Sequence, residues 1–91
     1  MRLQWTSKAL SDVVRLHDFL ASVNKTAAAR VVKSLVTAAS GLMASPRIGE
    51  RLEEFDPREI RRLIVGSYEV RYELAESTIY VLRIWHTREL R

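Results

Sequence analysis

The sequence predicts an α+β fold, in which a helical hairpin packs on one face of a small, mainly antiparallel sheet in the order β-α-α-β-β-β. Two observations predict it. Apolar side chains recur at helical spacing through residues 9–43, and short runs of strand character separated by turns fill residues 58–86. The 91 residues are enough for one domain, so we assign residues 1–91 to a single unit.

The chain begins with a predicted strand and helix. Residues 2–6 alternate apolar and polar side chains, and Thr6 or Ser7 is a suitable N-cap for the helix that follows. The apolar stripe of this helix recurs at i, i+3 and i+4 and consists of Leu10, Val13, Val14, His17, Leu20 and Ala21. We expect this stripe to face the sheet, with His17 in the core or at its boundary.

A second helix is predicted from Lys25 onward. Asn24 is expected to end the first helix, because asparagine adopts the left-handed conformation readily. Pro46 prevents the second helix from continuing far beyond Gly41. Its apolar stripe is rich in alanine and consists of Ala28, Val31, Val32, Leu35, Ala38, Ala39, Leu42 and Met43. The opposite face is only mildly basic, which favours packing on the sheet over adsorption to a membrane.

Residues 46–57 are expected to be a loop that connects the helices to three consecutive strands. Residues 60–65 form the first of these, and Gly66-Ser67 then provides a two-residue turn typical of β-hairpins. Residues 68–74 have strict period two, so alternate side chains should face the helices and the solvent. The inward side chains are expected to be Tyr68, Val70, Tyr72 and Leu74, and the outward ones Glu69, Arg71 and Glu73.

The last strand, residues 78–86, is apolar on both faces except at Arg83. A strand that is buried on both faces lies inside a sheet rather than at its edge. We therefore expect an interior strand, although the pattern does not define the order of the strands.

Composition excludes several classes of protein. The chain has no cysteine, so it has neither disulfides nor cysteine-ligated metals, and its two histidines lack the spacing of a metal site. We therefore predict no metal and no cofactor. No uninterrupted apolar run of about 18 residues is present to span a membrane. The start lacks the apolar segment of a secretory signal, so we expect a cytoplasmic protein.

The net charge of +4 is distributed unevenly. Residues 1–46 carry six basic and two acidic side chains, whereas residues 47–91 carry nine of each. Twelve of the fifteen basic residues are arginine, which favours planar contacts to carboxylates or phosphates. An acidic protein and a nucleic acid are both compatible partners, and solubility alone is the simpler explanation.

Arginines on the outer face of the sheet form the first candidate site. Arg71 and Arg83 are expected to be cross-strand neighbours. Either Arg61 or Arg62 would join them, depending on the face that each takes. Such a cluster would bind phosphate or the carboxylates of a partner. Alternatively, glutamates of the same face pair with the arginines in an exposed lattice, where each pair contributes about 0–1 kcal/mol.

His86 ends the last strand and is followed by Thr87 and Arg88, which makes it the second candidate. Its unperturbed pKa of about 6.5 suits a general acid or base, but a single histidine at a strand end more often has a structural hydrogen bond. Aromatic side chains offer a further alternative, since they either stack on nucleobases or pack the sheet, and their period-two placement favours packing. They are Trp5, Trp85, Tyr68, Tyr72 and Tyr80.

Several short stretches carry a resemblance to a known family. They are Trp5-Thr6, Ile60-Arg61-Arg62-Leu63, Gly66-Ser67-Tyr68-Glu69-Val70-Arg71-Tyr72 and Val81-Leu82-Arg83-Ile84-Trp85-His86-Thr87-Arg88-Glu89. With the order of elements and the length, these stretches resemble the RelE/ParE superfamily of toxins of type II toxin–antitoxin systems. The ending, in which Trp85-His86 follows Arg83 and precedes Arg88, is the most specific part.

The resemblance implies one of two activities. RelE-like members are small ribonucleases that cut mRNA in the ribosomal A site, whereas ParE-like members bind and inhibit DNA gyrase. The RelE-like strand usually reads Tyr-Arg-apolar-apolar-Tyr, and its Arg takes part in cleavage. Here Glu69 stands at that place and would repel the scissile phosphate, while Arg71 stands two residues further on. The Trp85-His86 ending is also more similar to ParE.

The resemblance therefore favours a ParE-like gyrase inhibitor rather than an enzyme, with plasmid stabilisation and growth inhibition as the associated roles. The alternative is a RelE-like endoribonuclease that uses Arg71, Arg83 and His86. The expected target-binding residues are Arg61, Arg62, Arg71, Arg83, Trp85, His86 and Arg88. The implied partner is a cognate ParD-like or RelB-like antitoxin with an acidic, disordered C-terminal segment. The toxin alone is not expected to bind operator DNA.

Overall fold

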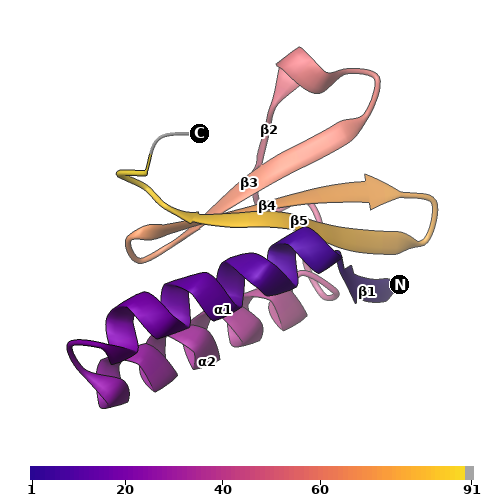
Figure 1. Ribbon diagram of the computed structural model, residues 1–91. Helices are drawn as coiled ribbons and strands as arrows, with labels where there is room; N and C mark the ends of the chain where they lie inside the picture. The colour runs from indigo at the N-terminus through magenta and orange to yellow at the C-terminus, as the bar shows by residue number, and fades with distance from the viewer. Residues whose placement is uncertain (90–91) are drawn as a thin grey trace.

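The computed structural model describes residues 1–89, which form two layers, with two helices on one face of a five-stranded sheet (Figure 1). The helices are α1 (Ser7–Ala21) and α2 (Lys25–Gly41), and the strands are β1 (Arg2–Trp5), β2 (Glu50–Arg51), β3 (Glu59–Val65), β4 (Tyr68–Ala75) and β5 (Thr78–His86). The strand order is β1-β5-β4-β3-β2, with β1 parallel to β5 and the other pairs antiparallel. The predicted α+β order and the interior place of the last strand are confirmed.

The segment between α2 and β3 contains more structure than the loop that we predicted. Residues Glu50–Arg51 form β2 and pair with Arg61 and Arg62 of β3, and a 3-10 helix, η1, follows at Glu53–Phe55. Figure 1 shows this segment rising away from the helices. A two-residue strand is too short to produce a period in the sequence, so it is defined by its partner rather than by its own pattern.

Both helices begin at side chains that cap them. Thr6 Oγ1 accepts a hydrogen bond from the Ala9 N–H at 3.1 Å, and Asn24 Oδ1 accepts one from the Ala27 N–H at 3.0 Å. The predicted break at Asn24 is confirmed, since α1 ends at Ala21 and α2 begins at Lys25. The left-handed conformation expected for Asn24 was wrong, because this residue is extended, with φ of −155°, and is the N-cap of α2. Within residues 1–89, neither helix is long and apolar enough to cross a bilayer.

The buried face of α1 differs from the predicted stripe. Ala9, Asp12 and Leu16 are buried, whereas Leu10 and Val14 are 53% and 59% exposed. The error arose because Asp12 looks like a surface residue in the sequence, although β5 requires its carboxylate, as described below. On α2 the predicted stripe is buried or half-buried except for Met43, which lies beyond the helix end and is exposed.

A bulge in β5 keeps apolar side chains facing the helices along the whole strand. Arg71 is opposite Arg83 but Tyr72 is opposite Val81, so Leu82 is an additional residue in β5. As a result Val81 and Ile84, although three residues apart, both belong to the core. Without the bulge, Arg83 would point toward the helices.

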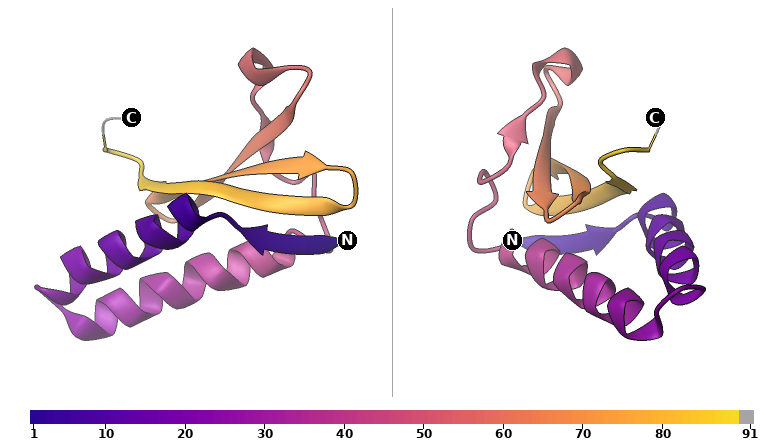
Figure 2. Two further views of the ribbon diagram at one scale, coloured as in Figure 1. Left: turned by 45° about the vertical axis from the view of Figure 1, so that its right-hand side comes forward. Right: turned by 90° about the vertical axis from the view of Figure 1, so that its left-hand side faces the viewer.

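The core lies between the helices and the inner face of the sheet (Figure 2). Its largest buried side chain belongs to Tyr72, whose hydroxyl donates to the Pro46 carbonyl at 2.8 Å and accepts from the Gly49 N–H at 3.0 Å. These bonds fix the segment that leads from α2 into β2. The predicted inward orientation of alternate β4 residues is confirmed for Val70, Tyr72 and Leu74, which are buried.

Candidate functional site

Three arginines occupy neighbouring positions on the face of the sheet that points away from the helices. Arg62 is opposite Arg71, and Arg71 is opposite Arg83, so the predicted cross-strand neighbours are adjacent. Arg61 does not join them, because it is opposite the inward-facing Tyr72. Its guanidinium donates to the Gly49 carbonyl at 2.7 Å and to the Glu59 carboxylate at 2.9 Å.

Carboxylates balance the charge of this arginine row. Arg71 Nη2 lies 2.8 Å from Glu69 Oε2, and Arg62 lies 2.7 Å from the Glu50 carboxylate and 3.9 Å from that of Glu69. Glu69 is only 1% exposed, so the expectation that it faces water was wrong. The reason is that long side chains of neighbouring strands lie over this face and cover the carboxylate.

Trp85 lies within the same layer. The guanidinium carbons of Arg71 and Arg83 lie 4.8 Å and 5.1 Å from its ring centroid, within the range of cation–π attraction. Arg71 also lies 5.7 Å from the Phe55 ring of η1. Trp85 is 8% exposed, so its ring supports the arginines and has little surface of its own for a partner.

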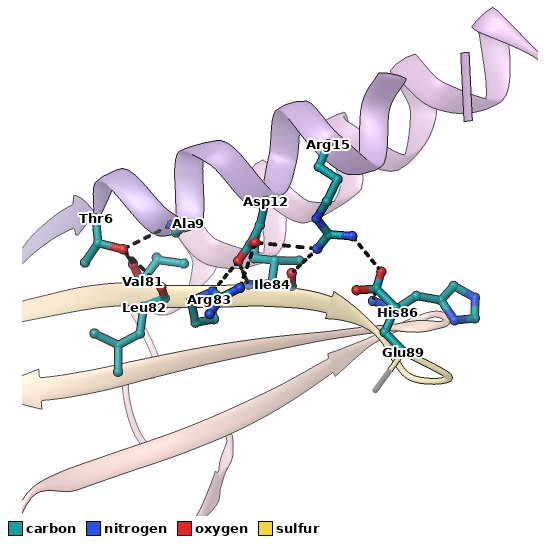
Figure 3. Close-up of polar contacts among 10 residues, drawn as sticks. All are labelled: Thr6, Ala9, Asp12, Arg15, Val81, Leu82, Arg83, Ile84, His86 and Glu89. Carbon is teal, nitrogen blue, oxygen red and sulfur yellow. Dashed lines mark hydrogen bonds and ion pairs between the residues drawn. The ribbon is translucent and has the colours of Figure 1, made fainter. Parts of the chain in front are cut away.

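Asp12 of α1 completes the edge of β5 where β1 ends (Figure 3). The last β1 residue paired to β5 is Trp5, and beyond it the Asp12 carboxylate accepts from the Ile84 N–H at 2.9 Å. The same carboxylate receives two bonds from Arg83, at 2.8 and 3.2 Å. The Thr6 hydroxyl lies 3.0 Å from the carbonyls of both bulge residues, Val81 and Leu82.

The protonation state of Asp12 follows from these contacts. Burial alone would raise the pKa of its carboxyl, but the hydrogen bonds from Arg83 and from the Ile84 N–H outweigh burial and hold the pKa below its ordinary value. Arg15 adds a weaker contact at 3.5 Å. Asp12 is therefore a charged group that fixes helix, strand and Arg83 together.

The C-terminal turn is held against α1 and the β3–β4 turn. Glu89 Oε1 accepts from Arg15 Nη1 at 3.0 Å and from the His86 N–H at 3.3 Å, and the Thr87 N–H donates to the Ser67 carbonyl at 2.8 Å. Burial tends to raise the pKa of Glu89, but the Arg15 guanidinium outweighs it and lowers that pKa.

His86 has the structural hydrogen bond that was one of its two predicted roles. Its Nδ1 accepts from the Arg88 N–H at 3.1 Å, and its ring meets the Tyr68 ring edge-on at 5.3 Å between centroids. The Arg88 guanidinium is exposed, and none of the ion pairs formed within residues 1–89 involves it. Over the same residues, no group of three or more His, Asp or Glu side chains is arranged to hold a metal.

A groove of about 620 Å³ lies between α1 and the C-terminal turn. It is lined by Arg15, Leu16, Phe19, Leu20, Tyr68, His86, Arg88 and Glu89. A second groove of about 320 Å³ lies on the other side of Tyr68, between α2 and the β3–β4 turn. The sequence analysis did not predict these grooves. The residue that could have indicated the larger one is Phe19, because it is a large aromatic residue outside the predicted apolar stripe of the helix, and in the structure it is 73% exposed.

Stability is expected to fall in acid. The pKa values of Asp12, Glu59, Glu73 and Glu89 lie below the ordinary values of 3.8 for Asp and 4.5 for Glu. Hydrogen bonds from Arg47 and Arg58 are the largest causes for Glu59 and Glu73. Because the folded pKa values are the lower ones, the stabilisation is complete above about pH 5 and is lost as pH falls through them.

Thermal unfolding followed by circular dichroism from neutral pH to about pH 3 measures this loss. We expect a melting temperature that is nearly constant down to about pH 5 and then falls steadily. A melting temperature that rises on acidification would contradict the assignment.

Comparison with known protein families shows to which of them the chain belongs. The model of the family described as "ParE toxin of type II toxin-antitoxin system, parDE" matches residues 3–91. The chain belongs to this ParE toxin family. The resemblance to the RelE/ParE superfamily, and the role as a toxin of a type II toxin–antitoxin system, are thereby confirmed.

One relative and one solved structure show what the ParE-family chain is similar to. It is 34% identical over 86 residues to a protein of Caulobacter vibrioides named Toxin RelE2, and the match covers 94% of each chain. Its fold is similar to a chain of the solved structure "Chromosomal ParDE TA system from P. aeruginosa", with a TM-score of 0.78. That match has 22% identity and covers 94% of this chain and 95% of the other, so it supports the fold alone.

Proposed function

We propose that this ParE-family toxin inhibits DNA gyrase without cleaving nucleic acid, and that a cognate antitoxin neutralises it. The observation that carries the proposal is the pairing of the sheet arginines. Arg71 is bonded to the buried Glu69, and Arg83 receives its countercharge from Asp12. A nuclease needs cations that are available to a scissile phosphate in the transition state.

The buried carboxylate of Glu69 supports the same proposal, whereas His86 does not distinguish the two activities. Its Nδ1 accepts from the Arg88 N–H, and its Nε2 remains available, which is sufficient for a general acid or base. The buried carboxylate of Glu69, two residues from Arg71 on the same strand, repels a phosphate at that face. Binding to a protein target needs neither a proton shuttle nor a phosphate site.

The proposed target surface is the end of β5 and the turn that follows. Arg88 and His86 supply its polar contacts, and Arg62, Arg71 and Arg83 form the adjoining sheet face. Arg61 and Trp85 are largely covered, so we assign them the role of supporting this surface. The toxin acts in the cytoplasm, with a ParD-like antitoxin as its partner and without binding operator DNA itself. Where a plasmid carries the genes for this toxin and its antitoxin, the two proteins would stabilise that plasmid.

Purified toxin is expected to inhibit gyrase in a supercoiling assay and to leave mRNA intact in a ribosome-dependent translation reaction. Arg88→Ala should weaken gyrase inhibition by about tenfold, because an exposed charged contact at an interface contributes about 1–2 kcal/mol. Lys8→Ala is the matched control, since Lys8 is also exposed and takes part in none of the ion pairs within residues 1–89. Full supercoiling together with cut mRNA would overturn the proposal.

The second candidate is ribosome-dependent mRNA cleavage through Arg71, Arg83 and His86. The observation that favours it is the relative named Toxin RelE2, which covers nearly the whole chain. Arg71 and Arg83 are also directly opposite one another, as two phosphate-binding groups would need to be. The translation reaction above separates this candidate from gyrase inhibition in one experiment.

A further inference from the structure

The described residues contain two groups of cations, one that is paired with carboxylates and one that is not. Every arginine of residues 47–83 belongs to the first group: Arg47, Arg51, Arg58, Arg61, Arg62, Arg71 and Arg83. The cations outside the ion pairs formed within residues 1–89 include Lys25, Arg30 and Lys33, and all three are exposed on α2. Residues 19–49 contain no acidic side chain that could neutralise them. Uncompensated positive charge therefore extends along one helix.

Two of these cations belong to a line of polar side chains on α2. Thr26, Arg30, Lys33 and Thr37 are spaced by four, three and four residues, so they lie above one another on one side of the helix. All four are exposed, and at 1.5 Å per residue the line is about 16 Å long. Figure 2 shows α2 at the periphery of the molecule, on the side of the helical layer that faces away from the strands. We call this line the α2 stripe.

We propose that the α2 stripe binds the phosphate backbone of duplex DNA, independently of base sequence. Phosphate contacts in protein–DNA complexes come from Arg, Lys, Ser and Thr side chains, and the stripe consists of such residues alone. A duplex carries one negative charge per about 1.7 Å of its axis, so both cations of the stripe would meet phosphates at the same time. Contact that is independent of sequence differs from operator recognition, which we do not expect of the toxin.

The β3–β4 turn beside α2 adds further hydrogen-bond donors. Gly66 and Ser67 of this turn line the groove of about 320 Å³ together with Arg30 and Ser34. The hydroxyls of Ser34 and Ser67 therefore lie near the guanidinium that would bind a phosphate. Both turn residues are small and exposed, so no bulky side chain of the turn prevents the approach of a duplex.

The composition of the stripe favours DNA over an acidic protein. Protein–protein interfaces have an apolar core within a polar rim, whereas protein–DNA interfaces are more polar and much more positively charged. The stripe has no apolar member that could anchor a protein. The arginines of the sheet are less suitable for DNA, because the carboxylates paired with them would repel its phosphates.

The role of this contact rests on the proposed function. Gyrase acts on duplex DNA, so a toxin bound to gyrase is close to that DNA. The proposed contacts to gyrase, His86 and Arg88, lie at the end of β5, whereas the α2 stripe lies on the helical layer. The toxin could therefore contact the enzyme and its DNA with different surfaces, and each contact would strengthen the other.

Fluorescence anisotropy of a labelled duplex of about 20 base pairs and arbitrary sequence tests the inference directly. At about 50 mM NaCl we expect binding with a dissociation constant of about 10⁻⁵–10⁻⁴ M, and a logarithmic salt dependence with a slope of about −2 to −3. The double variant Arg30→Gln/Lys33→Gln should weaken binding by about tenfold and reduce the slope by about two. Circular dichroism would establish that the variant is folded.

Arg51→Gln/Arg58→Gln is the matched control. It removes the same net charge at two exposed arginines, but these are paired with Asp56 and Glu73. Binding should stay within about threefold of the wild type. An equal loss in both double variants would mean that net charge alone determines binding, and it would overturn the inference. No binding of the duplex, or tighter binding of single-stranded RNA of the same length, would also overturn it.

The supercoiling assay separates this inference from the proposed function. The Arg30→Gln/Lys33→Gln toxin should need about fivefold more protein for the same inhibition, since it loses the DNA contact and keeps the gyrase contact. A toxin that binds DNA through α2 but leaves supercoiling intact contradicts only the proposed gyrase inhibition. A toxin that inhibits gyrase but does not bind the duplex contradicts only the DNA contact.

Discussion

Replacing Asp12 by alanine is expected to lower the free energy of unfolding by about 3 kcal/mol, because removing one partner of a buried ion pair costs about 3–5 kcal/mol. The lower end applies, since the side chain of Arg83 is 37% exposed and regains water when its partner is removed. The Ile84 N–H also loses its acceptor, and a buried N–H without a partner is costly. Helix α1 would then lose its bonds to Arg83 and to the Ile84 N–H, and the bond from Arg15 to the Ile84 carbonyl at 3.4 Å would remain.

Urea unfolding of the wild type and the variant measures this change. Asp18→Ala on the same helix is the control, and it should alter the free energy of unfolding by less than about 0.5 kcal/mol because Asp18 is exposed. Asp12→Asn keeps an oxygen for the Ile84 N–H but not the charge for Arg83, so an intermediate loss is expected. An alanine variant within about 1 kcal/mol of the wild type would show that Asp12 has no such role.

The second large effect is expected at Gly49. A Cβ at this position would lie 2.6 Å from the Arg62 carbonyl oxygen and 2.7 Å from the Tyr72 hydroxyl. The carbonyl belongs to the backbone of β3 and cannot move aside cheaply, so Gly49→Ala should cost about 2–3 kcal/mol of stability. Gly41→Ala is the matched control, and it is expected to raise the stability rather than lower it. Its Cβ would meet nothing within 4 Å at the end of α2, where alanine is the better helix former.

Removing the Tyr72 hydroxyl separates the two contacts at Gly49. In a Tyr72→Phe background the Gly49→Ala change should cost less, because the hydroxyl is gone, although the Arg62 carbonyl oxygen at 2.6 Å and the ring carbon Cε1 of residue 72 at 2.9 Å remain in the way. The difference between the two backgrounds, from a double-mutant cycle in urea, gives the coupling between Gly49 and the Tyr72 hydroxyl. Equal costs in both backgrounds would mean that the hydroxyl contact does not contribute to the effect.

The local sequence pattern was sufficient to predict much of the fold. The period-two run of β4, the Gly66-Ser67 turn and the N-cap at Thr6 each depend on a few neighbouring residues, and the structure has all three. The adjacency of Arg71 and Arg83 was also predicted, although simple counting from the β4–β5 turn would place Leu82 opposite Arg71. The bulge that brings Arg83 into place has no mark in the sequence.

Features that depend on distant residues could not be predicted from the pattern. Asp12 is buried because β1 ends at Trp5 and leaves the Ile84 N–H without a strand partner. Glu69 is buried because arginines of its own and a neighbouring strand lie over it. Neither residue interrupted a local pattern, since Asp12 lay outside the predicted stripe of α1 and Glu69 fitted the period of two in β4. Their burial depends on partners that are distant in the sequence or on a neighbouring strand, which a local period does not reveal.

The polar contacts along β5 also protect the sheet from joining another molecule. Where β1 stops, the backbone of β5 would be an open strand edge, and open edges are templates for aggregation. Thr6, Asp12 and Arg15 instead occupy the carbonyls and the N–H of residues 81–84. Side chains at the start of α1 thus occupy backbone groups with which the strand of another molecule would pair.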